Sequence, residues 1–149
     1  LGINGRLDSL QAAVLLAKLD IFADEVERRG AVGARYSELL QAGGARSVAD
    51  ARDGLLTPHV AAHNTSVYAQ YTVQADDRDA VIARLGAADI PTAVHYPIPL
   101  NRQGAYAHFC CPDCTPHADR AAARVFSLPM HPYLSVADAE RVVEVLTQA

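Results

Sequence analysis

An imidazole and a phenol stand side by side in AVHYPIPLNRQGAY, residues 93–106. Pro97 and Pro99 fix their own φ angles and favour extended backbone at the residues before them, so no helix can form here. His95 and Tyr96 are therefore presented on a stiff segment, where the imidazole can carry a proton and the phenol can donate a hydrogen bond. The residues alone leave two interpretations open: a site for polar ligand groups, or a strand end with a partly buried aromatic pair.

A second group of reactive side chains lies in HFCCPDCTPH, residues 108–117. Two cysteines and two histidines are a ligand set that zinc accepts, and here they recur at every third position: His108, Cys111, Cys114 and His117. So short a loop would be strained by four ligands, and its prolines stiffen it further. We therefore expect no metal but a reduced, irregular surface loop. The odd count of cysteines, with Cys110 left over, favours a reducing compartment and a cytoplasmic protein.

Two further candidates lie near the N-terminus. Lys18 is the one lysine of the chain, and its place at the edge of an apolar helical stripe predicts a surface residue rather than a Schiff-base nucleophile. Asn4 and Arg6 precede a predicted helix, where an amide and a guanidinium can hold an anion. The alternative for that pair is an Asn turn beside a surface arginine.

The periodicity of apolar residues predicts the elements that position these groups. Spacings of three and four predict helices over residues 7–21, with Asp8 or Ser9 as its cap, and over about 24–41, ending at Gly43-Gly44. Alternation predicts strands over 55–61, 67–75 and 92–96, with a helix from Asp76 before the third. Further elements are a helix over 118–124, an extended piece over 125–130 and a last helix opened by Ser135-x-x-Asp138.

These elements predict an α+β fold: long N-terminal helices followed by a small sheet of three or four strands with flanking helices. The net charge of −4 argues against a nucleic-acid partner, and no apolar run is long enough to span a membrane. The first predicted helix carries more apolar surface than such a sheet can cover. We therefore expect further structure before residue 1.

Three stretches in this order change the interpretation: GINGRLDSLQAAVLLAKL (2–19), HYPIPLNRQGAY (95–106) and FSLPMHPYLS (126–135). Together they resemble the C-terminal part of the DegT/StrS family of nucleotide-sugar aminotransferases. The resemblance implies the aspartate-aminotransferase fold, with residues 1–42 linking to a large domain that binds pyridoxal 5'-phosphate and residues 43–149 forming the small domain. It also implies a homodimer that moves an amino group from glutamate to a keto-sugar nucleotide.

The resemblance assigns roles to four residues. Asn4 matches the family asparagine that reaches the cofactor phosphate of the partner subunit, and Arg6 a nearby interface or substrate contact. His95 and Tyr96 match a segment that points toward the sugar nucleotide in the neighbouring active site.

The chain also departs from the family pattern, because it has no counterpart of the Schiff-base lysine and should be inactive alone. Two alternatives stay open. One is a relative that uses the cofactor for sugar dehydration, or that does no catalysis and acts as a sensor or regulatory partner. The other is a stand-alone metal-binding or interaction module built on the Cys/His loop.

Overall fold

The computed structural model describes residues 5–109, 111 and 113–148. These residues form, in chain order, α1 (Ser9–Ala42), β1 (Arg46–Ser47), β2 (Leu56–Thr57), β3 (Tyr71–Gln74), α2 (Arg78–Ala87), the short 3-10 helices η1 (Leu100–Arg102) and η2 (Ala107–Phe109), α3 (Pro116–Arg124), β4 (Val125–Leu128) and α4 (Val136–Thr147). The predicted α+β class, a helical N-terminal part followed by a small sheet with flanking helices, is confirmed.

The N-terminal part is one continuous helix, so the prediction of two helices is wrong. Asp8 caps α1, and its side chain accepts a hydrogen bond from the backbone N of Gln11 at 2.8 Å. No glycine or proline separates the two predicted segments. An Asp24–Arg28 ion pair of 2.7 Å, one helical turn apart, spans the junction and favours continuation. The helix ends at the predicted Gly43-Gly44 pair.

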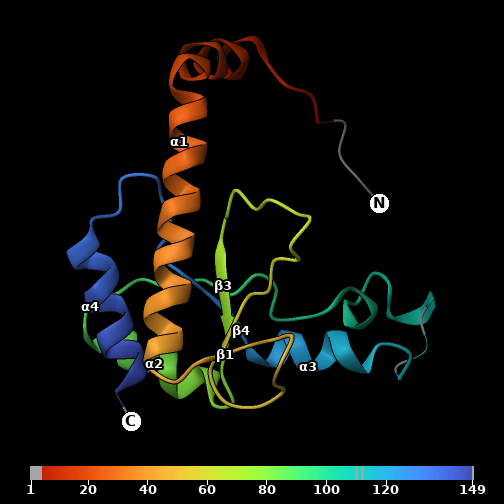
Figure 1. Cartoon of the computed structure of the whole chain (residues 1–149). Coiled ribbons are helices and arrows are strands. Elements are labelled where there is room, and N and C mark those ends of the chain that lie inside the picture. The colour runs from red at the N-terminus through yellow and green to blue at the C-terminus, as the bar shows by residue number, and fades with distance from the viewer. Residues whose placement is uncertain (1–4, 110, 112, 149) are drawn as a thin grey trace.

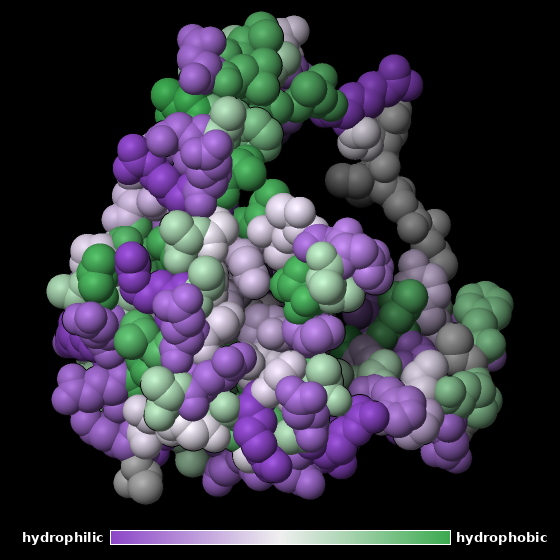
Figure 2. Space-filling model, viewed as in Figure 1, coloured by the Kyte–Doolittle hydropathy of each residue, from purple (hydrophilic) through white to green (hydrophobic). Residues whose placement is uncertain are grey.

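The two halves of α1 differ in how they are packed. Its buried residues all lie in the second half: Val32, Gly33, Tyr36 and Leu40. Figure 1 shows the first half rising beyond the rest of the molecule, and Figure 2 shows apolar residues gathered on it. Leu10 is 82% exposed there and Leu16 is 67% exposed. No helix among the described residues is long and apolar enough to cross a membrane.

The sheet has the strand order β1-β2-β3-β4, in which β1 and β2 are parallel and the other pairs antiparallel. The longest pairing joins β3 to β4, from Tyr71 opposite Leu128 to Gln74 opposite Val125. The strands predicted over 55–61 and 67–75 are real but shorter. Pro58 follows β2 directly and has no N–H to donate, which ends the pairing.

The core lies between this sheet and the helices α1, α2 and α4, which Figure 1 shows on one side of it. Tyr36 of α1 is fully buried, its ring centroid lies 5.1 Å from that of Tyr71, and its hydroxyl donates to the backbone oxygen of Pro129 at 3.0 Å. Phe126 of β4 is also fully buried in this core. The second half of α1 is thereby fixed to the strands on which the His-Tyr segment depends.

The predicted strand over 92–96 is wrong, because only Ala93 pairs with the sheet. Ala93 and Ser127 exchange two backbone hydrogen bonds, of 3.3 and 2.7 Å, as an isolated antiparallel bridge. In this register the next hydrogen-bonded pair would be Pro91 with Pro129, and neither residue has an N–H. The pairing therefore cannot extend in that direction.

The other predicted helices are confirmed close to their expected bounds. Asp77 caps α2 by accepting from the backbone N of Ala80 at 3.1 Å. Ser135 caps α4 by accepting from the backbone N of Asp138 at 3.0 Å, as the capping-box pattern predicts. The extended piece expected over 125–130 contains β4, whereas the two-residue β1 was not predicted.

Two glycines of α1 offer a matched test of this packing. A Cβ on Gly33 would overlap the ring of Tyr68, whereas nothing lies within 4 Å of the corresponding position on Gly30. Gly30→Ala should raise the free energy of unfolding by up to about 1 kcal/mol through helix propensity. Gly33→Ala should lower it by about 1–3 kcal/mol through overpacking. Urea unfolding of both variants checks this, and equal effects would contradict the packing of Tyr68 on α1.

A polar network at the edge of the sheet predicts a pH dependence. Arg124, only 8% exposed, donates to Asp76 and to the backbone oxygen of Gly54, and Gly54 N donates to Asp76 at 2.7 Å. The hydrogen bond from Arg124, and next that from Gly54, hold the pKa of Asp76 below its usual value. Since the folded pKa is lower than the unfolded one, this stabilisation is present above about pH 4 and is lost as the pH falls through the folded pKa.

The substitution Asp76→Asn should therefore flatten the loss of stability on acidification below about pH 4. The unfolding midpoint of this variant, measured in urea from neutral to acid pH, should fall less steeply than that of the unsubstituted protein. Asp50→Asn, at an exposed loop position, is the control and should keep the original slope. Identical slopes for all three proteins would contradict the role given to Asp76.

Candidate functional site

His95 and Tyr96 lie beside a groove of about 550 Å³. The chain turns away from the sheet directly after the Ala93 bridge, which carries both side chains to this edge. Tyr96 is 74% exposed, the His95 ring stands edge-on to it at 5.8 Å, and the peptide between them is cis. The groove is lined by His95, Tyr96, Ile98, Pro99, Leu100, Gln103, Ala118, Ala121, Ala122 and Val125.

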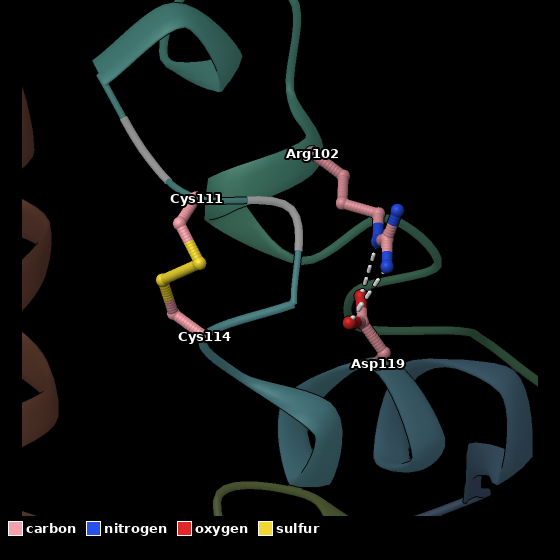
Figure 3. Close-up of a disulfide and its surroundings, with 4 residues drawn as sticks. All are labelled: Arg102, Cys111, Cys114 and Asp119. Carbon is pink, nitrogen blue, oxygen red and sulfur yellow. Dashed lines mark hydrogen bonds and ion pairs between the residues drawn. A yellow bond between two sulfur atoms is a disulfide. The ribbon is translucent and has the colours of Figure 1, made fainter.

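The two walls of the groove come from segments that are separate in sequence. One wall is the His-Tyr segment with η1, and the other is α3, whose alanines leave the space open. Arg102 of η1 fastens the walls together, because its guanidinium donates to both carboxylate oxygens of Asp119, at 2.6 and 3.0 Å (Figure 3). The hydrogen bond from Arg102 lowers the pKa of Asp119. This bidentate ion pair joins η1, on one side of the groove, to α3 on the other.

His95 also lines a second hollow, of about 240 Å³, on the other side of its segment. Ser127, Pro129 and Met130 of the FSLPMHPYLS stretch contribute to this hollow. The imidazole therefore stands between two concave surfaces. His95 and Tyr96 are both exposed among the described residues, so they are not the partly buried pair of the alternative interpretation.

The chemistry of the larger groove is that of a binding surface. Most of its lining is apolar, and the imidazole of His95, the phenol of Tyr96 and the amide of Gln103 supply polar groups at intervals. Such a surface suits a ligand with ring faces and hydroxyl edges, since apolar lining with a few placed polar groups is typical of small-molecule sites.

The other predicted site residues are not brought to this groove. Asn4 lies outside the described residues. Arg6 is described and exposed ahead of α1, and it does not line the groove. Lys18 lies on the exposed first half of α1, as expected for a surface lysine. As a donor set, an amide and a guanidinium such as those of Asn4 and Arg6 suit the phosphate of pyridoxal phosphate.

The cysteine loop differs from the expectation of reduced thiols. Cys111 and Cys114 are joined in a disulfide, with their Cα atoms 5.5 Å apart, a separation that is usual for such a bond (Figure 3). Within the described part of the chain no three metal-ligating side chains come together. Two of the four candidate zinc ligands are therefore bonded to each other instead.

Sequence reasoning missed the wall formed by α3. Ala118, Ala121 and Ala122 line the groove although nothing in their types suggests a ligand. The only sequence signal was a run of small residues in a short helix. The pairing of Arg102 with Asp119, 17 residues apart, likewise depends on tertiary structure.

Comparison with known proteins gives the family. The model of the DegT/DnrJ/EryC1/StrS aminotransferase family matches residues 1–147. The chain is 48% identical over 146 residues to the UDP-2-acetamido-2-deoxy-3-oxo-D-glucuronate aminotransferase of Pseudomonas aeruginosa, which covers 98% of this chain and 37% of the relative.

Solved structures agree with this match. The structure superposes on a DegT DnrJ EryC1 StrS aminotransferase from Brucella abortus with a TM-score of 0.82 at 40% identity, over 98% of this chain and 36% of the other. It superposes on DesV of S. venezuelae with a TM-score of 0.84 at 33% identity, over 98% and 37% of the two chains. The chain thus spans little more than a third of the relatives that it matches, and it belongs to the DegT/DnrJ/EryC1/StrS aminotransferase family.

Proposed function

We propose that this chain is the C-terminal part of a pyridoxal-phosphate-dependent nucleotide-sugar aminotransferase that uses glutamate as the amino donor. The observation that carries the proposal is the family match over residues 1–147, together with 48% identity to a relative named for that reaction class. The acceptor to test first is the one in that relative's name, a UDP-linked 3-keto sugar acid.

The exposed first half of α1 supports a larger partner domain. Large apolar side chains that are about half or more exposed recur along it and just before it: Leu7, Leu10, Val14, Leu15, Leu16, Leu19 and Phe22. A contiguous apolar face of this kind marks a surface that another body covers. In the proposal, residues 1–42 join a large cofactor-binding domain, and residues 43–149 form the small domain.

The cofactor, when bound, carries the amino group between donor and acceptor. In this chain Asn4, with Arg6 close by, would hold its phosphate across the subunit interface of a homodimer. The single lysine, Lys18, lies on the exposed first half of α1. In the proposal, the residue that binds the cofactor covalently belongs to the large domain, and the chain alone should be inactive.

The proposed role of His95 and Tyr96 is to bind the sugar nucleotide in the partner's active site. Both are exposed at the groove, and the prolines after them keep the segment extended. Neither the imidazole nor the phenol has a side-chain hydrogen bond among those found for the described residues. Their polar groups are therefore available to the hydroxyl and phosphate groups of a substrate.

The substitution His95→Ala in the full-length enzyme should lower kcat/KM for the sugar nucleotide about tenfold, through the loss of a hydrogen bond to substrate. The half-reaction with glutamate should keep its rate, because His95 is assigned to the acceptor alone. Single-turnover absorbance measurements separate the two half-reactions. His59→Ala, an exposed loop histidine that does not line the groove, is the control. Equal losses in both half-reactions would remove the substrate role.

The substitution Asn4→Ala should weaken cofactor retention, because one hydrogen bond to a charged phosphate is worth about 1.5–3 kcal/mol. The dissociation constant of pyridoxal phosphate, measured by equilibrium dialysis of the full-length protein, should rise about ten- to a hundredfold. Asn64→Ala, in an exposed turn, should leave it unchanged. An unaltered constant in the Asn4 variant would end that assignment.

A further inference from the structure

The disulfide of the cysteine loop lies at a structurally sensitive place. It joins Cys111 to Cys114, and Cys114 is followed directly by Thr115, the N-cap residue of α3. Both cysteines are exposed to solvent. A small thiol or a dithiol protein can therefore reach the bond from outside.

The start of α3 has few other attachments. Thr115 makes no side-chain capping hydrogen bond, and its hydroxyl is buried without a partner among the described atoms. A missing cap weakens a helix terminus. Three ties hold this end in place instead. They are the disulfide before it, the Arg102–Asp119 ion pair (Figure 3), and Arg120, which donates to the carboxylate of Asp53 and to the backbone oxygen of Arg52, at 2.7 Å in each case. Both ion pairs are partly exposed and so contribute modestly.

The same end of α3 forms one wall of the groove. Ala118 and Ala121 face the groove opposite His95 and Tyr96. A looser α3 start would therefore change the shape of the surface on which the groove's ligand rests. The disulfide and the residues of α3 that line the groove therefore lie on one short segment of the chain.

We propose that Cys111 and Cys114 form a reversible thiol–disulfide site that controls the order of the α3 start and hence one wall of the groove. The reductant is a dithiol. One of its thiolates attacks a sulfur of the bond, giving a mixed disulfide and releasing the other cysteine as a thiolate. The second thiol of the reductant then displaces the remaining cysteine. Two electrons and two protons pass to the pair, and the reductant leaves as its own disulfide.

This site goes beyond the aminotransferase proposal and does not need it. In reducing surroundings such an exposed pair is held as dithiol. Exchange with a small disulfide, which takes up the two electrons and two protons and leaves as two thiols, closes it again. The oxidised form, which the structure contains, is then the one with the ordered groove wall. A change in the ratio of thiols to disulfides around the protein would thus alter the groove wall without modifying any residue that lines the groove.

The pairing is tested first, on the full-length protein. All three cysteines fall in the tryptic peptide 103–120, so trypsin alone cannot separate them. Cleavage before Asp113 separates Cys114 from the other two. Digestion after alkylation without reduction should give the two halves linked, and prior treatment with dithiothreitol should give them free. Cys110→Ser should keep the link and Cys111→Ser should lose it. The reverse pattern, or no link after oxidation, would overturn the site.

The control of the groove wall is tested by hydrogen exchange of the same protein. Reduction should speed exchange of the amides in the first turns of α3 about tenfold, as expected for the loss of a loop-closing bond. Amides of α4 should not change. Cys111→Ser should exchange fast with or without reductant, whereas Cys110→Ser should respond like the unsubstituted protein. Equal exchange in the oxidised and reduced forms would refute the control, whatever reaction the enzyme catalyses.

Discussion

The placement of His95 and Tyr96 depends on one backbone bridge, between Ala93 and Ser127. Ser127 belongs to β4 and also pairs with Thr72 of β3, so the bridge attaches the His-Tyr segment to the centre of the core. Beyond Ala93 the next pair would join His95 to Val125, but the N–H of Val125 already donates to the backbone oxygen of Ala121, so the segment leaves the sheet at once. The two aromatic side chains consequently reach the surface rather than joining the core.

The position of this bridge depends in turn on the packing of α1 against the strands. Tyr36 fills the core beneath β3, and its hydroxyl binds the backbone of Pro129, two residues beyond Ser127. A second contact acts further up the helix, where Tyr133 donates to Glu25 at 2.9 Å. The stretch that follows β4 is thus tied to α1 at two points. The helix links the apolar face proposed to contact a larger domain to the strand that carries the candidate site.

The sequence was informative wherever the structure is decided locally. The caps at Asp8, Asp77 and Ser135 follow from side chains that bond to backbone groups three residues away, so they could be predicted. The prediction of two helices in place of α1 could not be judged from periodicity, because the exposed first half of α1 carries apolar residues at helical spacing just as the buried second half does. The strand expected over 92–96 failed for a tertiary reason: the N–H of Val125, which would pair with His95, donates to the backbone oxygen of Ala121 in α3 instead.

The candidate site could be predicted only in part, because some of its residues are placed by local sequence and others by tertiary contacts. His95 and Tyr96 could be identified from their own types and the prolines that follow. The opposing wall consists of alanines in α3, and its tie to η1 joins Arg102 to Asp119, so both depend on tertiary structure. The disulfide could not be chosen from sequence, because three cysteines lie within five residues. In the structure the bond joins Cys111 to Cys114.

We have proposed that this chain is part of an enzyme that transfers amino groups to nucleotide sugars. The most direct measurement is the visible absorption spectrum of the full-length protein with pyridoxal phosphate, first alone, then with glutamate, then with a UDP-linked 3-keto sugar. We expect a yellow protein that is bleached by glutamate and regains its colour with the keto sugar. A protein that stays colourless with added cofactor, or whose colour does not respond to either substrate, would contradict it.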